Sequence, residues 1–140
     1  MADKVSDVMT KEVVYLPAET TLEEAARAMR ERDIGDVVVT QGPELAGLVT
    51  DRDIVVRAVA DGRDPTSTRL GEITSRDIVM IQQDASTSDA ANLMRERAVR
   101  RLLVADDDRR LVGIVSLGDL AERMDPTSAL GEISSAAPNN

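Results

Sequence analysis

The chain has 140 residues, of which 42% are hydrophobic, and its 17 basic and 26 acidic side chains give a net charge of −9. It contains neither cysteine nor histidine, which excludes disulfides, the usual ligands of zinc, iron–sulfur clusters and haem, and Cys–His or Ser–His–Asp catalysis, so we expect no required cofactor. The negative charge and the single aromatic residue, Tyr15, argue against a nucleic-acid partner. The lack of cysteine and of an apolar, signal-like start predicts a cytoplasmic protein, and apolar runs no longer than a strand predict no membrane span.

In the first half of the chain we expect a strand, a helix, two strands and a second helix. Residues 13–16 are rich in β-branched side chains and predict the first strand. A capping box at 21–24 then starts a helix, whose apolar stripe is formed by Leu22, Ala25, Ala26 and Met29. Residues 37–39 and 45–49 predict a hairpin with a turn around Gly42. The second helix should bury Ile54, Val55, Ala58 and Val59.

The second half predicts the same elements in the same order. Residues 78–81 form its first strand, and the following helix has a stripe made of Thr87, Ala90, Ala91 and Met94. Residues 102–104 and 111–115 predict a hairpin, closed by an acidic turn at 106–108. Three consecutive acids in a tight turn point in different directions, so we do not expect a metal site there. The last helix should bury Leu120, Ala121 and Met124.

The two halves are copies of one another. The residues MRER at 29–32 return at 94–97, an offset of 65 residues. After one additional residue in the second copy, LAGLVT at 45–50 aligns with LVGIVS at 111–116. We therefore predict a first repeat over residues 1–68 and a second over residues 69–125.

The junction between the repeats is copied as well. The residues DPTS at 64–67 and LGEI at 70–73 recur as DPTS at 125–128 and LGEI at 130–133. We expect the second LGEI segment to pack as its twin does, on the opposite side of a pseudo-two-fold axis. The tail, residues 126–140, is rich in small and polar side chains, and we expect it to be largely disordered after about residue 134.

These elements predict an α+β fold made of two repeated β-α-β-β-α units. A half of about 60 residues cannot cover its own sheet well, whereas two halves together can bury a shared core. We therefore expect the repeats to pair about the pseudo-two-fold axis, with clefts between their two sheets.

A shared pattern follows each hairpin, at residues 47–53 and 113–119. It reads Gly, two apolar residues, Thr or Ser, and an Asp three positions later. One interpretation is a capping box, in which the hydroxyl and the carboxylate satisfy free backbone N–H groups. The alternative is a nucleotide site, because a helix start attracts phosphate and the carboxylate can accept from ribose hydroxyls. The glycines, Gly47 and Gly113, could admit a ligand closely or mark β-bulges.

With these junctions in duplicate, the sequence resembles the tandem cystathionine-β-synthase (CBS) domain pair, also called a Bateman module. The resemblance covers about residues 5–124. It also rests on Val8-Met9-Thr10 and Ile73-Thr74-Ser75, each before a first strand, and on residues 99–104.

The resemblance implies an adenosine-containing ligand such as AMP, ADP, ATP, S-adenosylmethionine or NAD in one or both clefts. Thr50 and Ser116 would touch phosphate, and Asp53 and Asp119 would hold ribose. The base would be bordered by Thr10, Lys11 and Val13 and by their counterparts Ser75, Arg76 and Ile78. Val37 and Leu102 would supply its apolar walls.

The two halves differ in charge at these positions. The first has Asp51 and Arg52 where the second has Leu117 and Gly118, so Arg52 favours phosphate while its neighbour opposes it. In the second half Arg100 and Arg101 replace Gly35 and Asp36. We expect these two arginines to attract phosphate, unless they serve only as charges on a solvated strand edge.

These features predict a stand-alone regulatory module that binds an adenosyl ligand and signals by a conformational or oligomeric change. We expect a homodimer, arranged head-to-head or head-to-tail, and an effector protein that the sequence does not identify. The alternative is a scaffold of the same fold that binds no nucleotide. The sequence shows no convergent pair of candidate acid and base residues, so we do not expect an enzyme.

Overall fold

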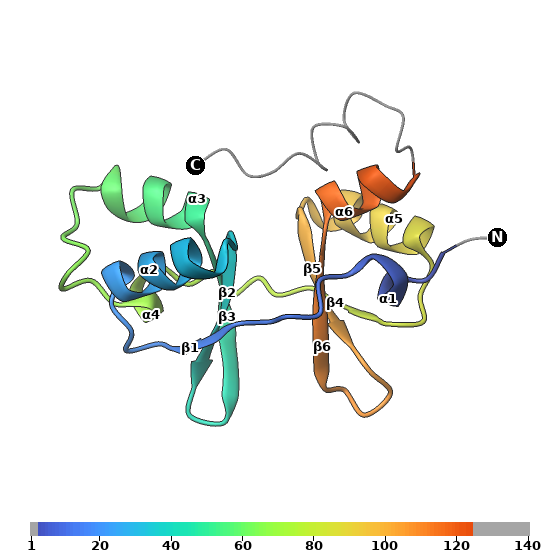
Figure 1. Cartoon of the computed structure of the whole chain (residues 1–140), viewed down its shortest axis with the longest axis horizontal. Coiled ribbons are helices and arrows are strands. Elements are labelled where there is room, and N and C mark those ends of the chain that lie inside the picture. Colours follow the sequence, from blue (N-terminus) through green and yellow to red (C-terminus); the bar gives the residue numbers. More distant parts are fainter. Residues whose placement is uncertain (1–2, 125–140) are drawn as a thin grey trace. The chain divides into compact units, whose positions relative to one another are not determined.

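The computed structural model describes residues 3–124, which form two compact units. The first-repeat unit comprises residues 14–78, and the second-repeat unit comprises residues 3–13 together with 79–124. Both units have a three-stranded sheet and helices (Figure 1), which confirms the predicted α+β fold of repeated β-α-β-β-α units. The compact units, divided at 13/14 and 78/79, are a different division of the chain from the sequence repeats predicted at 1–68 and 69–125. The predictions for 126–140 lie outside the described residues.

The first-repeat unit is built on the sheet β1-β2-β3, in which β1 is parallel to β2 and β2 is antiparallel to β3. Its elements are β1 (Tyr15–Pro17), α2 (Leu22–Arg32), β2 (Asp36–Gln41), β3 (Glu44–Thr50), α3 (Asp51–Asp53), η1 (Ile54–Val59) and α4 (Leu70–Ile73). The core contains Leu22 and Ala25 of α2, Val37 of β2 and Leu70 of α4. The first strand begins two residues later than predicted.

The second-repeat unit has the same topology, with sheet order β4-β5-β6. Its elements are α1 (Val5–Val8), β4 (Met80–Gln82), α5 (Thr87–Arg97), β5 (Arg101–Ala105), β6 (Leu111–Ser116) and α6 (Leu117–Met124). Its core joins Val5 of α1 to Ala90 and Met94 of α5 and Leu120 of α6. In the part of the chain that is described, no helix is long and apolar enough to cross a membrane.

The long helix of each unit is delimited by its own residues. Thr21 Oγ1 accepts from Glu24 N (3.2 Å) at the start of α2, and Ser86 Oγ accepts from Asp89 N (3.0 Å) at the start of α5. The helices end at Asp33 and Ala98, which adopt the left-handed conformation. Most of each predicted stripe is buried, although Ala26 is exposed.

The predicted face of the helix after the first hairpin is wrong in part. Val55 and Val59 are 57% and 61% exposed, whereas Ala58 is buried and Ile54 packs against the core. The segment η1 is π-helical, with a bond from Ala60 N to Val55 O. A π-helix has more residues per turn than an α-helix, so the expected spacing no longer holds. In α6, Leu120 is buried as predicted, and the Met124 side chain lies outside the described part.

Candidate functional site

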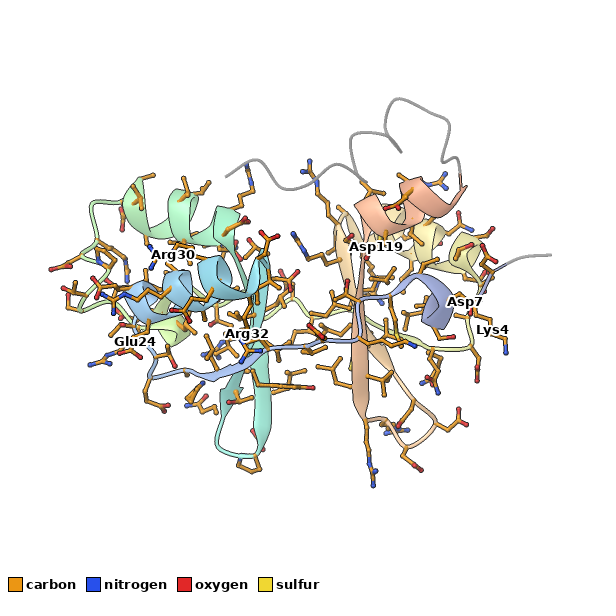
Figure 2. The ribbon with its side chains drawn as sticks, in the orientation of Figure 1. Lys4, Asp7, Glu24, Arg30, Arg32 and Asp119 are labelled. Atoms are coloured by element: carbon orange, nitrogen blue, oxygen red, sulfur yellow. The ribbon has the colours of Figure 1, made fainter. Side chains whose placement is uncertain are left out.

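Both hairpin-to-helix junctions form the reciprocal capping box that one interpretation predicted. In the first-repeat unit, Asp53 N donates to Thr50 Oγ1 (3.0 Å) and Thr50 N donates to Asp53 Oδ2 (2.8 Å). In the second, Asp119 N donates to Ser116 Oγ (3.1 Å) and Ser116 N donates to Asp119 Oδ2 (2.9 Å). Figure 2 shows Asp119 at the start of α6. The bonds leave each hydroxyl proton free to be donated, so capping does not exclude a ligand.

The helix tip of the first-repeat unit is occupied by the chain itself. Asp51 N donates to Gly35 O (2.9 Å), and Arg52 N donates to the side chain of Asp51 (2.8 Å). The third N–H of the helix belongs to the Thr50–Asp53 box. The other oxygen of Asp53 lies 3.7 Å from Arg57 Nε. A carboxylate of the protein therefore already takes the position that an anionic ligand would need.

The tip of the second-repeat unit is open by comparison. Leu117 N donates to Arg100 O (2.8 Å), and no atom of residues 3–124 accepts from Gly118 N. A leucine replaces Asp51, and exposed Arg100 replaces Gly35. A Cβ added at Gly35 would lie 3.3 Å from Asp51 Oδ2. The Arg100 side chain therefore leaves the backbone beside the position that the carboxylate occupies in the first unit.

The segments predicted to border the base are exchanged between the repeats. Thr10 precedes the first strand, yet it pairs with Ile114 of β6 through two backbone hydrogen bonds (2.8 and 3.0 Å). Ser75 precedes the first strand of the second repeat, yet it pairs with Leu48 of β3 (3.2 Å in both directions). Thr10 therefore pairs with the residue two positions before Ser116, and Ser75 pairs with the residue two positions before Thr50. Each base-bordering segment is thus placed near the capping hydroxyl of the other repeat.

The fifteen predicted site residues consequently fall into two groups. The second-repeat unit holds Thr10, Lys11, Val13, Arg100, Arg101, Leu102, Ser116 and Asp119. The first-repeat unit holds Val37, Thr50, Arg52, Asp53, Ser75, Arg76 and Ile78. Val37 and Leu102 belong to the buried cores of their units. Their side chains offer no surface to a ligand, because strand alternation turns them toward the helices.

The exchanged segments also explain the two glycines that precede the helix tips. A Cβ at Gly47 would overlap Ser75 O and Thr74 Cγ2, and a Cβ at Gly113 would lie 2.5 Å from Met9 Sδ and 2.9 Å from Thr10 O. The close approach at these glycines is therefore made by the chain itself and leaves no room there for a ligand. The hairpins also change register beside both glycines, as the bulge interpretation predicted.

The acidic turn of the second hairpin is held by one of its own carboxylates. Asp106 Oδ1 accepts from the backbone N of Asp108 and of Arg110, both at 2.9 Å. Within the described residues, no group of three or more acidic side chains is arranged to hold a metal ion.

The family is decided by a comparison with protein-family models. The model of the CBS domain matches twice, at residues 5–59 and 70–125. This chain belongs to the CBS domain family.

Similar proteins support the assignment of this CBS-domain pair. The CBS domain-containing protein YhcV of Bacillus subtilis is 40% identical over 117 residues, which cover 84% of this chain and 82% of YhcV. A solved CBS-domain protein of Burkholderia ambifaria, assigned to signal transduction, aligns with a TM-score of 0.76 at 29% identity over 84% of this chain and 86% of that one. The hexameric CBS-CP12 protein of bloom-forming cyanobacteria aligns with a TM-score of 0.80 at 28% identity, over 89% and 74% of the two chains. The chain is a tandem CBS module, a generally regulatory kind of domain pair.

Proposed function

We propose that this CBS module binds an adenosine-containing ligand, with an anionic group of the ligand at the start of α6. AMP, ADP, ATP, S-adenosylmethionine and NAD all combine an anion with a ribose. The observation that carries the proposal is the open Gly118 N–H beside the Ser116 hydroxyl, with the side chain of Arg100 leaving the backbone next to it. A helix N-terminus and an arginine both stabilise phosphate.

The remaining groups of the second-repeat unit suit the other parts of such a ligand. Asp119 uses Oδ2 to cap Ser116 N, which leaves Oδ1 to accept from ribose hydroxyls. Thr10 pairs with Ile114, two residues before Ser116, and exposed Lys11 follows Thr10 in the sequence. The first-repeat tip, where Asp51 holds Arg52 N, takes part in binding less or not at all.

The ligand then acts as a regulatory signal. It can shift a conformational or oligomeric equilibrium only by the difference between its affinities for the two states. In this proposal the signal passes on to a separate effector protein. A scaffold that binds no nucleotide is the competing function, and it explains the capping boxes equally well.

Homodimers are the oligomeric form we propose, through the exposed face of η1. Val55, Val56 and Val59 are between 49% and 61% exposed, and a two-fold partner could cover all three. The double substitution Val55→Asp and Val59→Asp should convert dimers to monomers in light scattering after size exclusion. A wild-type monomer at high concentration would disprove this interface.

Ligand titration tests the binding proposal. At about 0.3 kcal/mol per atom, the roughly 23 non-hydrogen atoms of AMP correspond to a dissociation constant of the order of 10 μM. A concentration 100 times higher should stabilise the fold by about 2.7 kcal/mol. Melting curves with AMP, ADP, ATP, S-adenosylmethionine and NAD measure this effect.

A matched pair of arginine variants shows where the ligand binds. Arg100→Ala should weaken binding about tenfold, a loss of about 1.4 kcal/mol. Arg97→Ala removes the same charge from the exposed end of α5 and should leave the affinity unchanged. If none of the five ligands raises the melting temperature, the scaffold function holds instead.

A further inference from the structure

Helices α1 and α4 dock on equivalent places of the two units through backbone hydrogen bonds. Val5 N and Ser6 N donate to Ala85 O (2.8 Å) and Gln83 O (3.1 Å) in the second-repeat unit. At the 65-residue offset, Leu70 N and Gly71 N donate to Thr20 O (2.8 Å) and Ala18 O (3.0 Å) in the first.

The same correspondence continues on both sides of these helices. Thr87 N donates to Asp3 O (2.9 Å), as Leu22 N donates to Thr68 O (3.0 Å). Beyond the helices, Thr10 pairs with Ile114 as Ser75 pairs with Leu48. We call the backbone of Gln83, Ala85, Thr87 and Ile114 the α1 docking site. Because these hydrogen bonds join backbone groups, docking requires a segment of suitable shape with two apolar anchors and no particular polar side chain.

The anchors are larger in α4 than in α1. Leu70 and Ile73 are at most 4% exposed in the first-repeat unit. In α1 the corresponding residues are two valines, of which Val5 is buried and Val8 is half-buried. A leucine and an isoleucine bury more apolar area than two valines, so an LGEI segment has the greater intrinsic tendency to dock.

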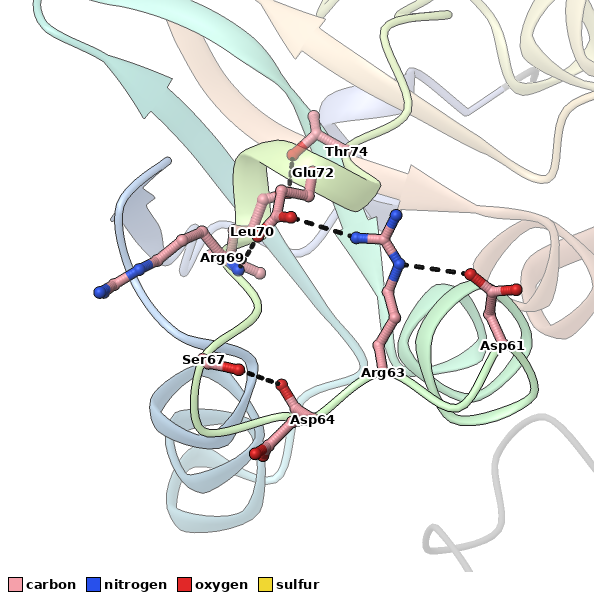
Figure 3. A network of polar contacts seen from close by, with 8 residues as sticks. All are labelled: Asp61, Arg63, Asp64, Ser67, Arg69, Leu70, Glu72 and Thr74. Carbon is pink, nitrogen blue, oxygen red and sulfur yellow. Dashed lines mark hydrogen bonds and ion pairs between the residues drawn. The ribbon is translucent and has the colours of Figure 1, made fainter.

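Counting α1 and α4 as two copies of the docking segment, the sequence contains a third at residues 130–135, and the described residues contain only two docking sites. Residues 130–135 read LGEISS, which differs from LGEITS at 70–75 in one side chain. Figure 3 shows the contacts that hold residues 70–75: Glu72 Oε2 accepts from Arg69 N (2.6 Å), and Thr74 Oγ1 donates to Leu70 O (2.6 Å). Glu132 and Ser134 supply the same functional groups at the matching positions.

We propose that residues 130–135 are a second occupant of the α1 docking site, in exchange with residues 5–10 of the same chain. Helices α1 and α6 are in contact, so the connection between them has a short distance to span. Five residues separate Met124 from Leu130, and six extended steps reach about 20 Å. In the first-repeat unit Arg57 Nη1 lies 3.3 Å from Ile73 O, so the helix that follows the hairpin and the docked segment are neighbours there.

The exchange changes the surroundings of the α6 tip. It withdraws Thr10 from Ile114, together with the residues next to Thr10 in the sequence. It brings Ser135 to the same strand, followed by the uncharged Ala136. The tail is thus an internal competitor for the backbone position two residues before Ser116. The exchange itself does not require the proposed ligand. If the ligand binds at the α6 tip, the exchange can affect its binding.

Disulfide trapping tests the exchange, because the chain has no cysteine of its own. Lys4 and Ser86 are partners in an antiparallel bridge, as are Thr21 and Arg69. Such partners have Cα atoms about 4.5–5.5 Å apart, within the range of a disulfide. Lys4→Cys with Ser86→Cys reports docked α1, and Thr21→Cys with Arg69→Cys is the positive control. Ala129→Cys with Ser86→Cys reports the third copy.

We expect the Ala129→Cys, Ser86→Cys pair to form a disulfide within single chains. Its rate should exceed by about tenfold that of Ala129→Cys with Asp107→Cys, which measures random encounters with the exposed hairpin turn. Val5→Ala, which weakens the resident segment, should raise the rate severalfold, and circular dichroism verifies that this variant folds. Leu130→Asp with Ile133→Asp should reduce the rate to that of the control.

Two results would overturn the exchange. The first is a rate equal to that of the Asp107→Cys control, or one that Leu130→Asp and Ile133→Asp leave unchanged. The second is a disulfide found only between two chains, which would make a second copy the occupant. Neither result depends on a nucleotide, so this inference and the proposed function can fail separately.

Discussion

The two helix tips have the same capping box and differ in the charges placed around it. At the start of α3, the carboxylate of Asp51 accepts from Arg52 N beside Gly35. At the start of α6, Leu117 and Arg100 stand at these positions, and within residues 3–124 nothing accepts from Gly118 N. The comparison shows that a cap can be kept for the fold while its neighbours decide whether an anion can approach.

The largest expected effects concern the glycines before the tips. Gly47→Ala would force a Cβ into the backbone of Ser75, which cannot move without breaking its pairing with Leu48. We expect the free energy of unfolding to fall by about 2–3 kcal/mol. Gly113→Ala should cost less, about 1–2 kcal/mol, because its closest contact is the flexible side chain of Met9, and the backbone atom Thr10 O, at 2.9 Å, needs a smaller shift than Ser75 O does at Gly47.

Urea unfolding of both alanine variants measures this difference. Gly35→Ala is the matched control, since its Cβ would meet only the end of the Asp51 side chain at 3.3 Å, and it should change stability by less than about 1 kcal/mol. Equal stability of Gly47→Ala and the wild type would contradict the close approach of the exchanged segment.

Exchanging the residue after each cap should change ligand binding next most strongly. Leu117→Asp places at the α6 tip the carboxylate that Asp51 provides at the α3 tip. We expect it to weaken the binding of an anionic ligand about tenfold or more, because it adds a competing negative charge and an acceptor for Gly118 N. Calorimetric titration with ATP measures the loss.

The reverse substitution, Asp51→Leu, removes the carboxylate that holds Arg52 N. It should leave binding at the α6 tip unchanged, and any new binding would be at the first tip. If Leu117→Asp and Asp51→Leu had the same effect, the difference between the tips would have no role in binding.

Removing the capping hydroxyls separates stability from ligand binding. Thr50→Ala and Ser116→Ala should each lower the free energy of unfolding by about 1 kcal/mol, since each removes the acceptor of one helix N–H. Only Ser116→Ala should also weaken ligand binding. Denaturation and titration of the same two proteins check both parts, and a ligand affinity reduced equally in both would make the two tips equivalent.

The smallest expected effect is the pH dependence of the junction after η1. Hydrogen bonds from the Thr66 hydroxyl and then from Thr66 N hold the pKa of Asp64 below its usual 3.8. The folded carboxyl therefore releases its proton more readily than the unfolded one. Its stabilisation is complete above pH of about 3.8 and is lost as the pH falls through the lower folded pKa.

Asp64→Asn should consequently be slightly less stable than the wild type at pH 7, and the two melting temperatures should converge as the pH falls below the folded pKa of Asp64. A difference in melting temperature that stays constant down to that pH would show that the carboxylate charge has no part in holding this turn.

Much of the fold could be predicted because its signals are local or repeated. The caps at Thr21 and Ser86 and the boxes at Thr50 and Ser116 are short-range hydrogen bonds, and the duplicated sequence showed that they recur. The exposure of Val55 and Val59 could not be predicted, since a π-helical turn has no clear pattern in the sequence. The burial of Val37 was also missed, because both faces of a short apolar strand look alike.

The sequence by itself determined the two repeats, their elements and the residues that begin the helices. Each of these depends on spacing within a few residues or on comparison of the halves. Only the tertiary structure decided that Thr10 lies against the second repeat and Ser75 against the first. These pairings join backbone groups far apart in the chain, and such bonds require no particular side chain, so they leave almost no mark on the sequence except a glycine where the two backbones meet.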